Sequence, residues 1–522
     1  MEAYPMSRLN AAGHPRSEHE TASESRRRSS TSRSRAMSPA IQHDEEFLEF
    51  LERILSRFCL ALVPSYLQEA AGGEPPKPTR SNDIAALDGL RGWACLLVYN
   101  FHFLFTYTYD THLGWGFANS NFGIHQLPIV HLLISGHVMV AIFFVISGYV
   151  LSFRPLKTIR SRSYEQTFMV LSSATFRRAF RLYLPTMIGM FCVLVAVQLG
   201  LFNESRRVVD RGGTITAVNE QHPPVMETTS EQLWDWYKTV VRLTNCWSWK
   251  LYYNNYNPHL WTIPVEFRCS IVLFLTLLAI SRFTTRVRLI LEALLIWFSA
   301  RWGRWDVVLF LGGLVLVEID LANGVWTTPR NSSNRPANTL PGTGEKPPES
   351  SHPVNHIFGQ HATLFWKWFF VFGLYVASSP NSAGRYTPGF RWLAELTPRT
   401  YPEPHRFPQS LGAFMLVHAI TNCTAIQRLF TAPISQYLGR ISYAFYIVHG
   451  PILHGLGFAL MPRLWAVTGR ETNLQFCAGA AVGWSVCLVL SLWLADLFWR
   501  VVDVPCVRFT RWLEGKLLAA GN

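Results

Sequence analysis

The stretch Ala86–Tyr107, ALDGLRGWACLLVYNFHFLFTY, has the length of a membrane-spanning helix but contains polar groups that a lipid bilayer disfavours. Arg91 and His102 are 11 residues apart. At about 100° per residue this is about three turns, so both lie on one face, separated by about 17 Å of rise. Asp88 precedes Arg91 on that face. Because such groups usually face a bundle interior or a watery cavity, we expect the chain to enclose a chamber here.

The composition indicates a membrane protein. Of the 522 residues, 49% are hydrophobic and only 16% are charged, and there are 35 Phe and 19 Trp. The net charge of +13 does not indicate nucleic acid, because the basic residues cluster at the ends of apolar segments. The nine cysteines form no C-x-x-C pair and no metal-like spacing, so we predict buried thiols and no metal site.

Apolar runs of about 20 residues predict an all-α, polytopic bundle of about ten transmembrane helices. These runs are roughly 88–108, 130–153, 179–202, 261–281, 286–301, 305–321, 362–378, 408–426, 437–460 and 474–500. Both termini are then cytosolic, and so is a basic loop at 154–178, in agreement with the positive-inside rule.

The segments outside these runs divide the chain. No apolar signal peptide precedes the first run, so that run is expected to target the protein to the membrane. The expected divisions are a disordered basic tail (1–45), an amphipathic interfacial helix and linker (46–81), a membrane domain (82–505) with a Pro- and Ser-rich insert (322–361), and a cytosolic tail (506–522).

A cluster of basic residues stands in Phe176–Pro185, FRRAFRLYLP. Arg177, Arg178 and Arg181 could anchor a helix at the cytosolic surface. Alternatively, they could bind the phosphates of a cytosolic donor, since guanidinium groups form paired hydrogen bonds with phosphate.

An acidic residue, Glu266, enters an apolar helix within His259–Phe267, HLWTIPVEF. A buried carboxylate needs a partner or a proton. Glu266 could orient an imidazole, bind an acceptor hydroxyl, or join two helices.

A polar stripe occurs in Gly439–His454, GRISYAFYIVHGPILH. Ser442, Tyr446 and His449 follow one another at spacings of four and three, which places them on one face of a helix. The stripe could form interhelical hydrogen bonds or face the chamber. In Phe143–Leu151, FFVISGYVL, the Ser-Gly pair favours close helix packing.

Taken in order, DGLRG with Arg91 and His102, FFVISGYVL, FRRAFRLYLP, LWTIPVEF and GRISYAFYIVHGPI resemble the signatures of the acyltransferase-3 family of integral-membrane acyltransferases. The resemblance implies about ten membrane helices and the transfer of an acyl group, often acetyl from acyl-CoA, to a hydroxyl of a sugar, glycan, lipid or small molecule. It also implies that His102 is the essential histidine with Arg91 as its partner. The remaining signatures contain Glu266, Ser442, Tyr443 and His449.

We therefore expect an O-acyltransferase that uses acyl-CoA as co-substrate and holds no bound cofactor. A thioester carbonyl is already electrophilic, so the protein must mainly activate the hydroxyl and stabilise the oxyanion. Imidazole titrates near neutrality, which suits His102 as general base; the alternative is an acyl relay. The expected catalytic residues are His102, Arg91 and Glu266, and the expected substrate- and CoA-binding residues are Arg177, Arg178, Arg181, Ser442, Tyr446 and His449.

The rival interpretation is a proton-coupled transporter, which would use the same intramembrane charges. No internal repeat relates the two halves of the chain, and this favours the enzyme. A membrane scaffold or receptor would leave the buried charges without a purpose. The expected partners are membrane lipids, acyl-CoA and a hydroxyl-bearing acceptor, without nucleic acid, and the expected location is a eukaryotic secretory-pathway or plasma membrane.

Overall fold

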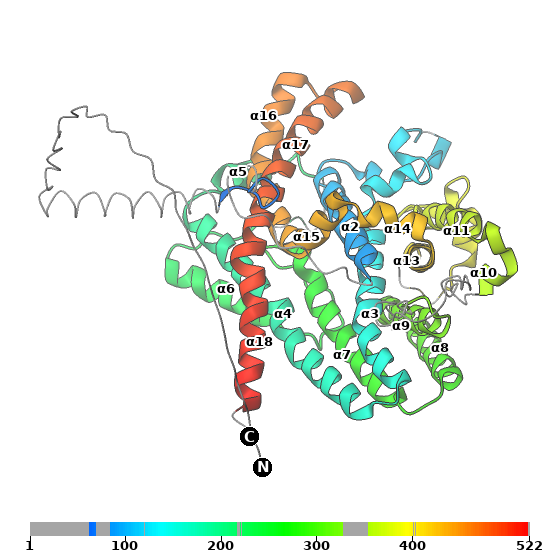
Figure 1. The fold of residues 1–522 in the computed structure, drawn as a ribbon. Coiled ribbons are helices and arrows are strands. Elements are labelled where there is room, and N and C mark those ends of the chain that lie inside the picture. The colour runs from blue at the N-terminus through cyan, green and yellow to red at the C-terminus, as the bar shows by residue number, and fades with distance from the viewer. Residues whose placement is uncertain are drawn as a thin grey trace, which may run out of the picture. The chain divides into compact units, whose positions relative to one another are not determined.

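The computed structural model describes residues 62–68, 84–119, 121–216, 220, 222–326, 353–399, 401 and 403–519. The expected disordered tail, most of the expected interfacial segment and the centre of the insert lie outside these residues. Throughout the described ranges, every regular element is a helix (Figure 1).

The longer helices follow one another along the chain as α2 (Ala85–Phe105), α3 (Gly136–Arg160), α4 (Tyr164–Gln198), α5 (Asn203–Arg211), α6 (Thr229–Leu243), α7 (Thr262–Ile280), α8 (Thr285–Arg301), α9 (Trp305–Ala322), α10 (Pro353–Phe358), α11 (Ala362–Ala377), α12 (Arg391–Leu396), α13 (Arg406–Asn422), α14 (Thr424–Thr431), α15 (Pro433–Ile452), α16 (Phe458–Thr468), α17 (Asn473–Phe498) and α18 (Val504–Ala519). The 3-10 turn η5 (Pro258–Trp261) leads into α7. Two π-helical segments, η9 (Leu453–Gly457) and η10 (Trp499–Asp503), join α15 to α16 and α17 to α18.

Five helical stretches in the described ranges are long and apolar enough to cross a membrane: Gly136–Arg160, Tyr164–Gln198, Pro258–Ile280, Pro433–Thr468 and Asn473–Leu518. Each of the ten expected apolar runs overlaps a helix. The number of helices that cross the membrane and the side on which the termini lie stay predictions.

The expected loop at 154–178 is wrong. Helix α3 continues to Arg160 and α4 begins at Tyr164, so the basic residues stand on two long helices. The reason is that apolar residues continue along one face of each helix. Leu156 and Leu171 are buried, while Arg160 and Arg162 between them are exposed. Arg177 and Arg178, farther along α4, line a cavity.

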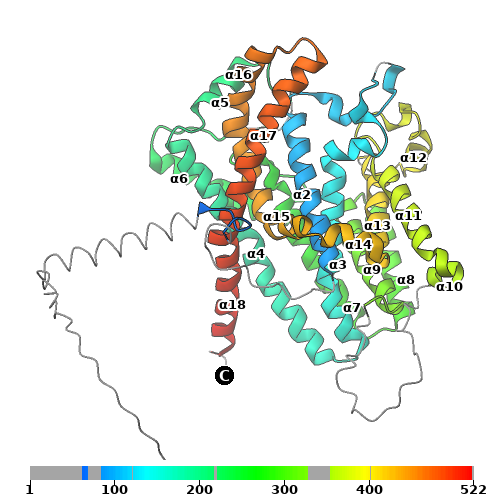
Figure 2. The ribbon, with the colours of Figure 1, turned by 45° about the horizontal axis from the view of Figure 1, so that its top comes forward.

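Helix α2 is central to the bundle, with α15 packed on one side and α3 on the other (Figure 2). Helices α2 and α15 approach so closely that a Cβ on Gly92 would lie 2.3 Å from the backbone nitrogen of Gly439. Only glycine fits there. The glycines of the DGLRG stretch therefore bring Arg91 next to α15.

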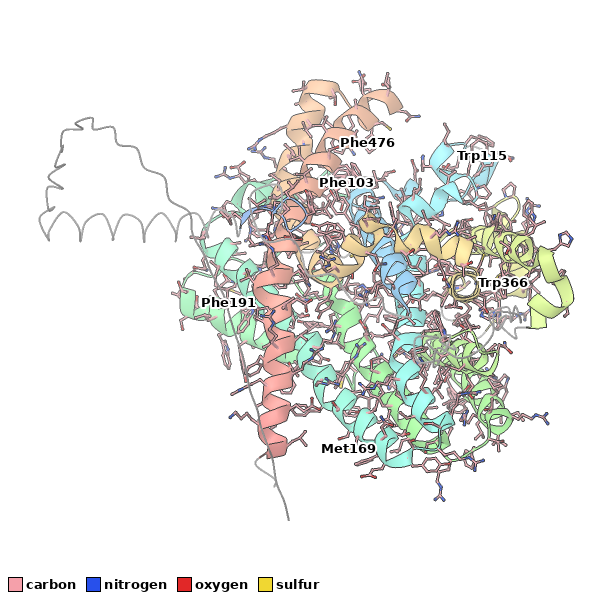
Figure 3. All side chains as sticks on the ribbon, in the orientation of Figure 1. Phe103, Trp115, Met169, Phe191, Trp366 and Phe476 are labelled. Atoms are coloured by element: carbon pink, nitrogen blue, oxygen red, sulfur yellow. The ribbon has the colours of Figure 1, made fainter. Side chains whose placement is uncertain are left out.

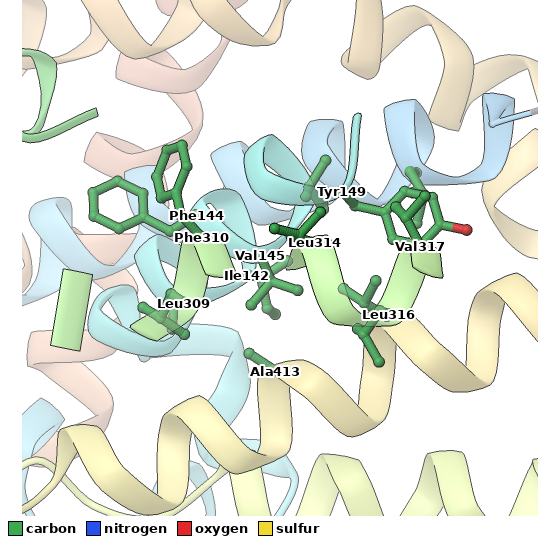
Figure 4. Close-up of a cluster of buried hydrophobic side chains, with 14 of the residues drawn as sticks. Ile142, Phe144, Val145, Tyr149, Leu309, Phe310, Leu314, Leu316, Val317 and Ala413 are labelled. Carbon is green, nitrogen blue, oxygen red and sulfur yellow. The ribbon is translucent and has the colours of Figure 1, made fainter. Parts of the chain in front are cut away.

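The main hydrophobic core lies between α3, α9 and α13 (Figure 4). Phe144 and Val145 of α3 pack there against Phe310 and Leu314 of α9. A Cβ on Gly148 would lie 2.1 Å from the carbonyl oxygen of Phe310, so this glycine permits the close packing expected from the sequence. The core fixes α3, which forms one wall of the site described next.

Two labelled side chains mark the opposite ends of the bundle (Figure 3). Phe103, next to His102 on α2, lies toward one end, and Met169, near the start of α4, lies toward the other. We name these the histidine end and the arginine end, because α4 carries Arg177, Arg178 and Arg181 between Met169 and the middle of the bundle.

Candidate active site

A cavity of about 440 Å³ opens between α2, α3, α4, α7, α15 and the C-terminal helix. We name it the arginine pocket, because six guanidinium groups line it: Arg91, Arg177, Arg178, Arg181, Arg440 and Arg511. Among the described residues, the acidic residues that line the same cavity are Glu266 and Asp503. This excess of positive charge suits a ligand with several negative charges.

Contacts with its own helix, α2, and with the neighbouring helix α15 hold the guanidinium of Arg91 at the pocket wall. It forms an ion pair with Asp88 at 3.0 Å, one turn earlier on α2. It also donates to Ser442 Oγ at 3.1 Å and to the carbonyl of Gly439 at 3.3 Å, both on α15. Arg91 thus joins the first and the last of the signature stretches, and its side chain remains one-third exposed toward the pocket.

Glu266 also faces the arginine pocket. Its carboxylate accepts a hydrogen bond from Arg178 at 2.6 Å and from Ser147 at 3.0 Å. Arg178 donates as well to Ser270 at 2.9 Å, one turn beyond Glu266. Of the three roles considered from the sequence, these contacts match the joining of helices, here α7 to α3 and α4. Among the described residues, the carboxylate that contacts His102 is not Glu266 but Glu220.

The inner end of the arginine pocket approaches the histidines. Along α2 its lining extends from Arg91 to Val98, one turn before His102. Tyr446 and Thr262 line the same end, and their hydroxyls are 2.6 Å apart. The Tyr446 hydroxyl also donates to the backbone carbonyl of His259. The pocket therefore connects a region rich in cations to the immediate surroundings of the imidazoles.

Four imidazoles gather beyond that inner end: His102, His259, His449 and His454. The ring of His259 lies 3.6 Å from that of His102 and 5.0 Å from that of His449, measured between centroids. All except His102 are almost completely buried, and the His102 side chain is 17% exposed. We name these four residues the histidine cluster.

A single carboxylate, Glu220, contacts three members of the cluster. Its oxygens lie 3.6 Å from His102 Nδ1 and 3.4 Å from His259 Nε2, and they accept a hydrogen bond from His454 Nε2. The Glu220 side chain is only 5% exposed. The distance to His102 Nδ1 is longer than a hydrogen bond, but it places a buried carboxylate directly beside this imidazole.

The electrostatics around Glu220 favour its ionised form. Burial alone would raise the pKa of this carboxyl. The charge that His259 carries when protonated, together with hydrogen bonds from His259 and His454, outweighs burial and holds the pKa of Glu220 well below its ordinary value. The cluster thus contains a permanent negative charge in contact with His102.

Local backbone geometry places the histidines. His259 stands on the 3-10 turn η5, which Asn257 ties to α15 by donating to the carbonyl of Ile447 at 2.8 Å. His454 stands on the π-helical segment η9, a feature often found at functional sites. A Cβ on Gly450 would lie 2.6 Å from His259 Nδ1, so this glycine leaves the space that the ring needs.

The same side chains could hold a metal ion. One ligand atom from each of Glu220, His259 and His454 lies within 4.8 Å of the others, and so does one from each of His102, His259 and His449. Imidazole nitrogen and carboxylate oxygen are ligands that Zn²⁺ accepts. No local sequence pattern indicates these sets, because their members come from distant segments.

The structure brings together most of the residues expected from the sequence. Arg91, Ser442 and Tyr446 line the arginine pocket, together with the three arginines of α4 and Glu266. His449 lies instead in the histidine cluster, where its Nδ1 donates to the Phe445 carbonyl at 3.0 Å.

Several site residues were missed from the sequence. His259 and His454 stand within two of the quoted stretches, so both were within reach of the sequence reasoning. Glu220 had no signal, because no motif or periodicity surrounds it. Arg511 and Asp503 were overlooked because the last apolar run was expected to end near residue 500.

Comparison with known proteins identifies the family of the chain. Residues 84–500 match the acyltransferase-3 family, which is described as an acyltransferase domain, and the chain therefore belongs to that family. The chain is 32% identical over 447 residues to the O-acetyltransferase PaAT-1 of Phomopsis amygdali, covering 83% of this chain and 84% of that protein.

Two further fungal proteins are similar over most of their length. Acyltransferase R4 of Phoma sp. is 28% identical over 470 residues, which cover 82% of this chain and 95% of that protein. Acyltransferase clz18 of Cochliobolus lunatus is 26% identical over 465 residues, with the same coverage. No solved structure matches the chain.

Proposed function

We propose that this membrane acyltransferase moves an acyl group, most simply acetyl, from acyl-CoA to an acceptor hydroxyl, with His102 as general base. The observation that carries the proposal is the continuity of the site. One cavity begins among six arginines and ends one turn of α2 before His102. That arrangement suits a donor that is polyanionic at one end and reactive at the other.

The arginine end binds the phosphates of the donor. Arg91 and Arg178 are held in place by Asp88 and Glu266, whereas Arg181 is exposed on the pocket wall. With the phosphates bound there, the thioester of the extended donor reaches the inner end, where Tyr446 and Thr262 offer hydroxyl groups. In this proposal the arginine end faces the cytosol, where acyl-CoA is found.

The histidine end activates the acceptor. The acceptor oxygen attacks the thioester carbonyl while its proton passes to His102, and the resulting imidazolium is stabilised by the Glu220 carboxylate. When the carbon–sulfur bond breaks, the proton passes to the departing thiolate. The products are the acylated hydroxyl and CoA with a free thiol, and no bound cofactor or metal takes part.

The nature of the acyl group and acceptor is supported by the relatives. A similar protein carries the name O-acetyltransferase, which favours acetyl and an oxygen acceptor. The acceptor is a sugar, glycan, lipid or small molecule with a free hydroxyl. We further propose that the protein is a multi-pass component of the secretory-pathway or plasma membrane, in contact with membrane lipids.

The test uses purified protein in nanodiscs with radiolabelled acetyl-CoA and an extract of lipids and glycans from the native host. Wild type is expected to release CoA and to label an extract component. His102→Ala should do neither, while His361→Ala, which changes an exposed histidine away from the site, should act as wild type. A wild-type protein that neither binds CoA nor releases it would contradict the proposal and favour the transporter.

A further inference from the structure

The C-terminal helix forms a wall of the arginine pocket, although it lies beyond the part of the chain that matches the family. The family match ends at residue 500, and the sequence suggested only a tail after residue 505. In the structure, α17 continues through η10 into α18, which packs along α4 (Figure 1). Asp503, Val507, Thr510 and Arg511 line the pocket.

These four residues form one stripe. They are spaced by four, three and one positions, which places them on one helix face opposite α4. Farther out, Glu514 of α18 pairs with Arg177 of α4 at 3.4 Å, so the two helices are joined beyond the stripe. The stripe is therefore held at the pocket and is not a free tail.

Asp503 is an unusual wall residue. It is only 6% exposed, and among the described residues its Oδ1 has no hydrogen-bond partner. It stands at the end of the π-helical segment η10, as His454 stands within η9. A buried carboxylate oxygen without a partner, facing a cavity, is costly unless a ligand supplies a donor.

Arg511 complements this acceptor at the outer part of the stripe. Arg511 is exposed and lines the pocket, and it lies about two helical turns beyond Asp503 along the chain. Arg177 lines the same outer part from the side of α4. Because Arg177 is paired with Glu514, a phosphate at this part of the pocket would be bound by Arg511 through a charge-assisted hydrogen bond.

We propose that the C-terminal helix recognises the nucleotide end of acyl-CoA: Arg511 binds the 3′-phosphate, and Asp503 accepts a hydrogen bond from an N–H or O–H group of the donor. This inference rests on the proposed function, since it assigns one wall of the proposed donor site. The helix thereby selects a donor that carries a phosphorylated nucleotide over a simpler thioester.

The experiment measures equilibrium binding of CoA and 3′-dephospho-CoA to the full-length protein in nanodiscs. Wild type is expected to bind CoA about tenfold more tightly than the dephosphorylated form, the effect of one charge-assisted hydrogen bond. Arg511→Gln should bind the two equally. The control Arg508→Gln makes the same change on the same helix outside the pocket lining and should keep the tenfold preference.

The outcomes separate this inference from the proposed function. If wild type binds neither compound, the proposed function fails. If wild type binds CoA but does not distinguish the two, or if Arg511→Gln keeps the preference, only the assignment of the C-terminal helix is overturned.

The role of Asp503 is tested by whether its substitution weakens or tightens the binding of the two nucleotides. Asp503→Leu should weaken binding of both nucleotides about tenfold, and Asp503→Asn, which keeps a carbonyl acceptor, should bind as wild type. Tighter binding by Asp503→Leu would overturn the hydrogen bond, because removing a negative charge from a cationic pocket would then only favour the polyanion.

Discussion

The arginine end and the histidine end of the site differ in their contact with solvent. The guanidinium groups line an open cavity, and Arg181 and Arg511 are exposed. The imidazoles of His259, His449 and His454 are buried, and two of them, His259 and His454, contact one buried carboxylate. Cations that bind a polyanion lose little by staying hydrated, whereas proton transfer benefits from a dry and fixed base. The arginine pocket and the histidine cluster beyond its inner end thus meet opposite requirements for contact with water.

Glu220→Gln is expected to produce the largest change that separates the two ends. Loss of the carboxylate removes the charge that orients His102, so kcat should fall about a hundredfold. KM for acetyl-CoA should stay near the wild-type value, because the arginine pocket is untouched. Steady-state kinetics would measure both parameters, with Glu227→Gln, an exposed residue in the same loop, as control. A rise in KM without a fall in kcat would place Glu220 with the donor.

Arg181→Gln tests the other end. Removing one guanidinium from the pocket should raise KM for acetyl-CoA about tenfold and leave kcat nearly unchanged. The KM of wild type should also rise with added salt, because exposed charges are screened. Arg154→Gln, which changes an exposed arginine on α3 outside the pocket lining, serves as control. Equal losses of kcat in Arg181→Gln and Glu220→Gln would remove the distinction between the two ends.

Gly450→Ala tests the spacing inside the histidine cluster. A Cβ at this position would lie 2.6 Å from His259 Nδ1 and 2.8 Å from Asn257 Oδ1, so the ring must shift. We expect kcat to fall several-fold with normal CoA binding. At Gly455 the nearest side-chain atom would lie 3.6 Å from an added Cβ, and Gly455→Ala should therefore act as wild type. Matching activities of the two variants would show that the ring position is not critical.

The smallest effect concerns stability and pH. Because folding lowers the pKa of Glu220, its carboxylate stabilises the folded protein above the pKa of an unfolded glutamate, about 4.3. This contribution begins to decrease below that value and is lost as the pH falls through the lower pKa of Glu220 in the folded protein. Wild type should thus melt a few degrees above Glu220→Gln at pH 7, and the difference should shrink below about pH 4. Thermal melts in detergent would measure it, and a difference that grows toward low pH would reverse the assignment.

Local sequence patterns predicted the arginine end well. Arg177, Arg178 and Arg181 share one helix, so their spacing alone places them together, and Arg91 and His102 share another. The helices themselves follow from apolar runs. The expectation of a basic loop at 154–178 was wrong. These residues are mostly helical, because apolar residues continue on the buried faces of α3 and α4.

The histidine end depends on contacts between distant segments. Glu220 lies in a stretch without periodicity, and its partner His454 is 234 residues away. No local pattern predicts such a contact. The C-terminal wall escaped prediction for a different reason, since a π-helical segment lets α17 continue beyond the last apolar run.

The central claim is that donor binding and hydroxyl activation occupy opposite ends of one pocket. Its most direct test is equilibrium binding of acetyl-CoA to His102→Ala in nanodiscs, measured beside CoA release by the same sample. The account predicts wild-type affinity for acetyl-CoA and a loss of CoA release of at least about a hundredfold. Loss of binding together with release, in a variant that elutes and melts as wild type, would contradict the account.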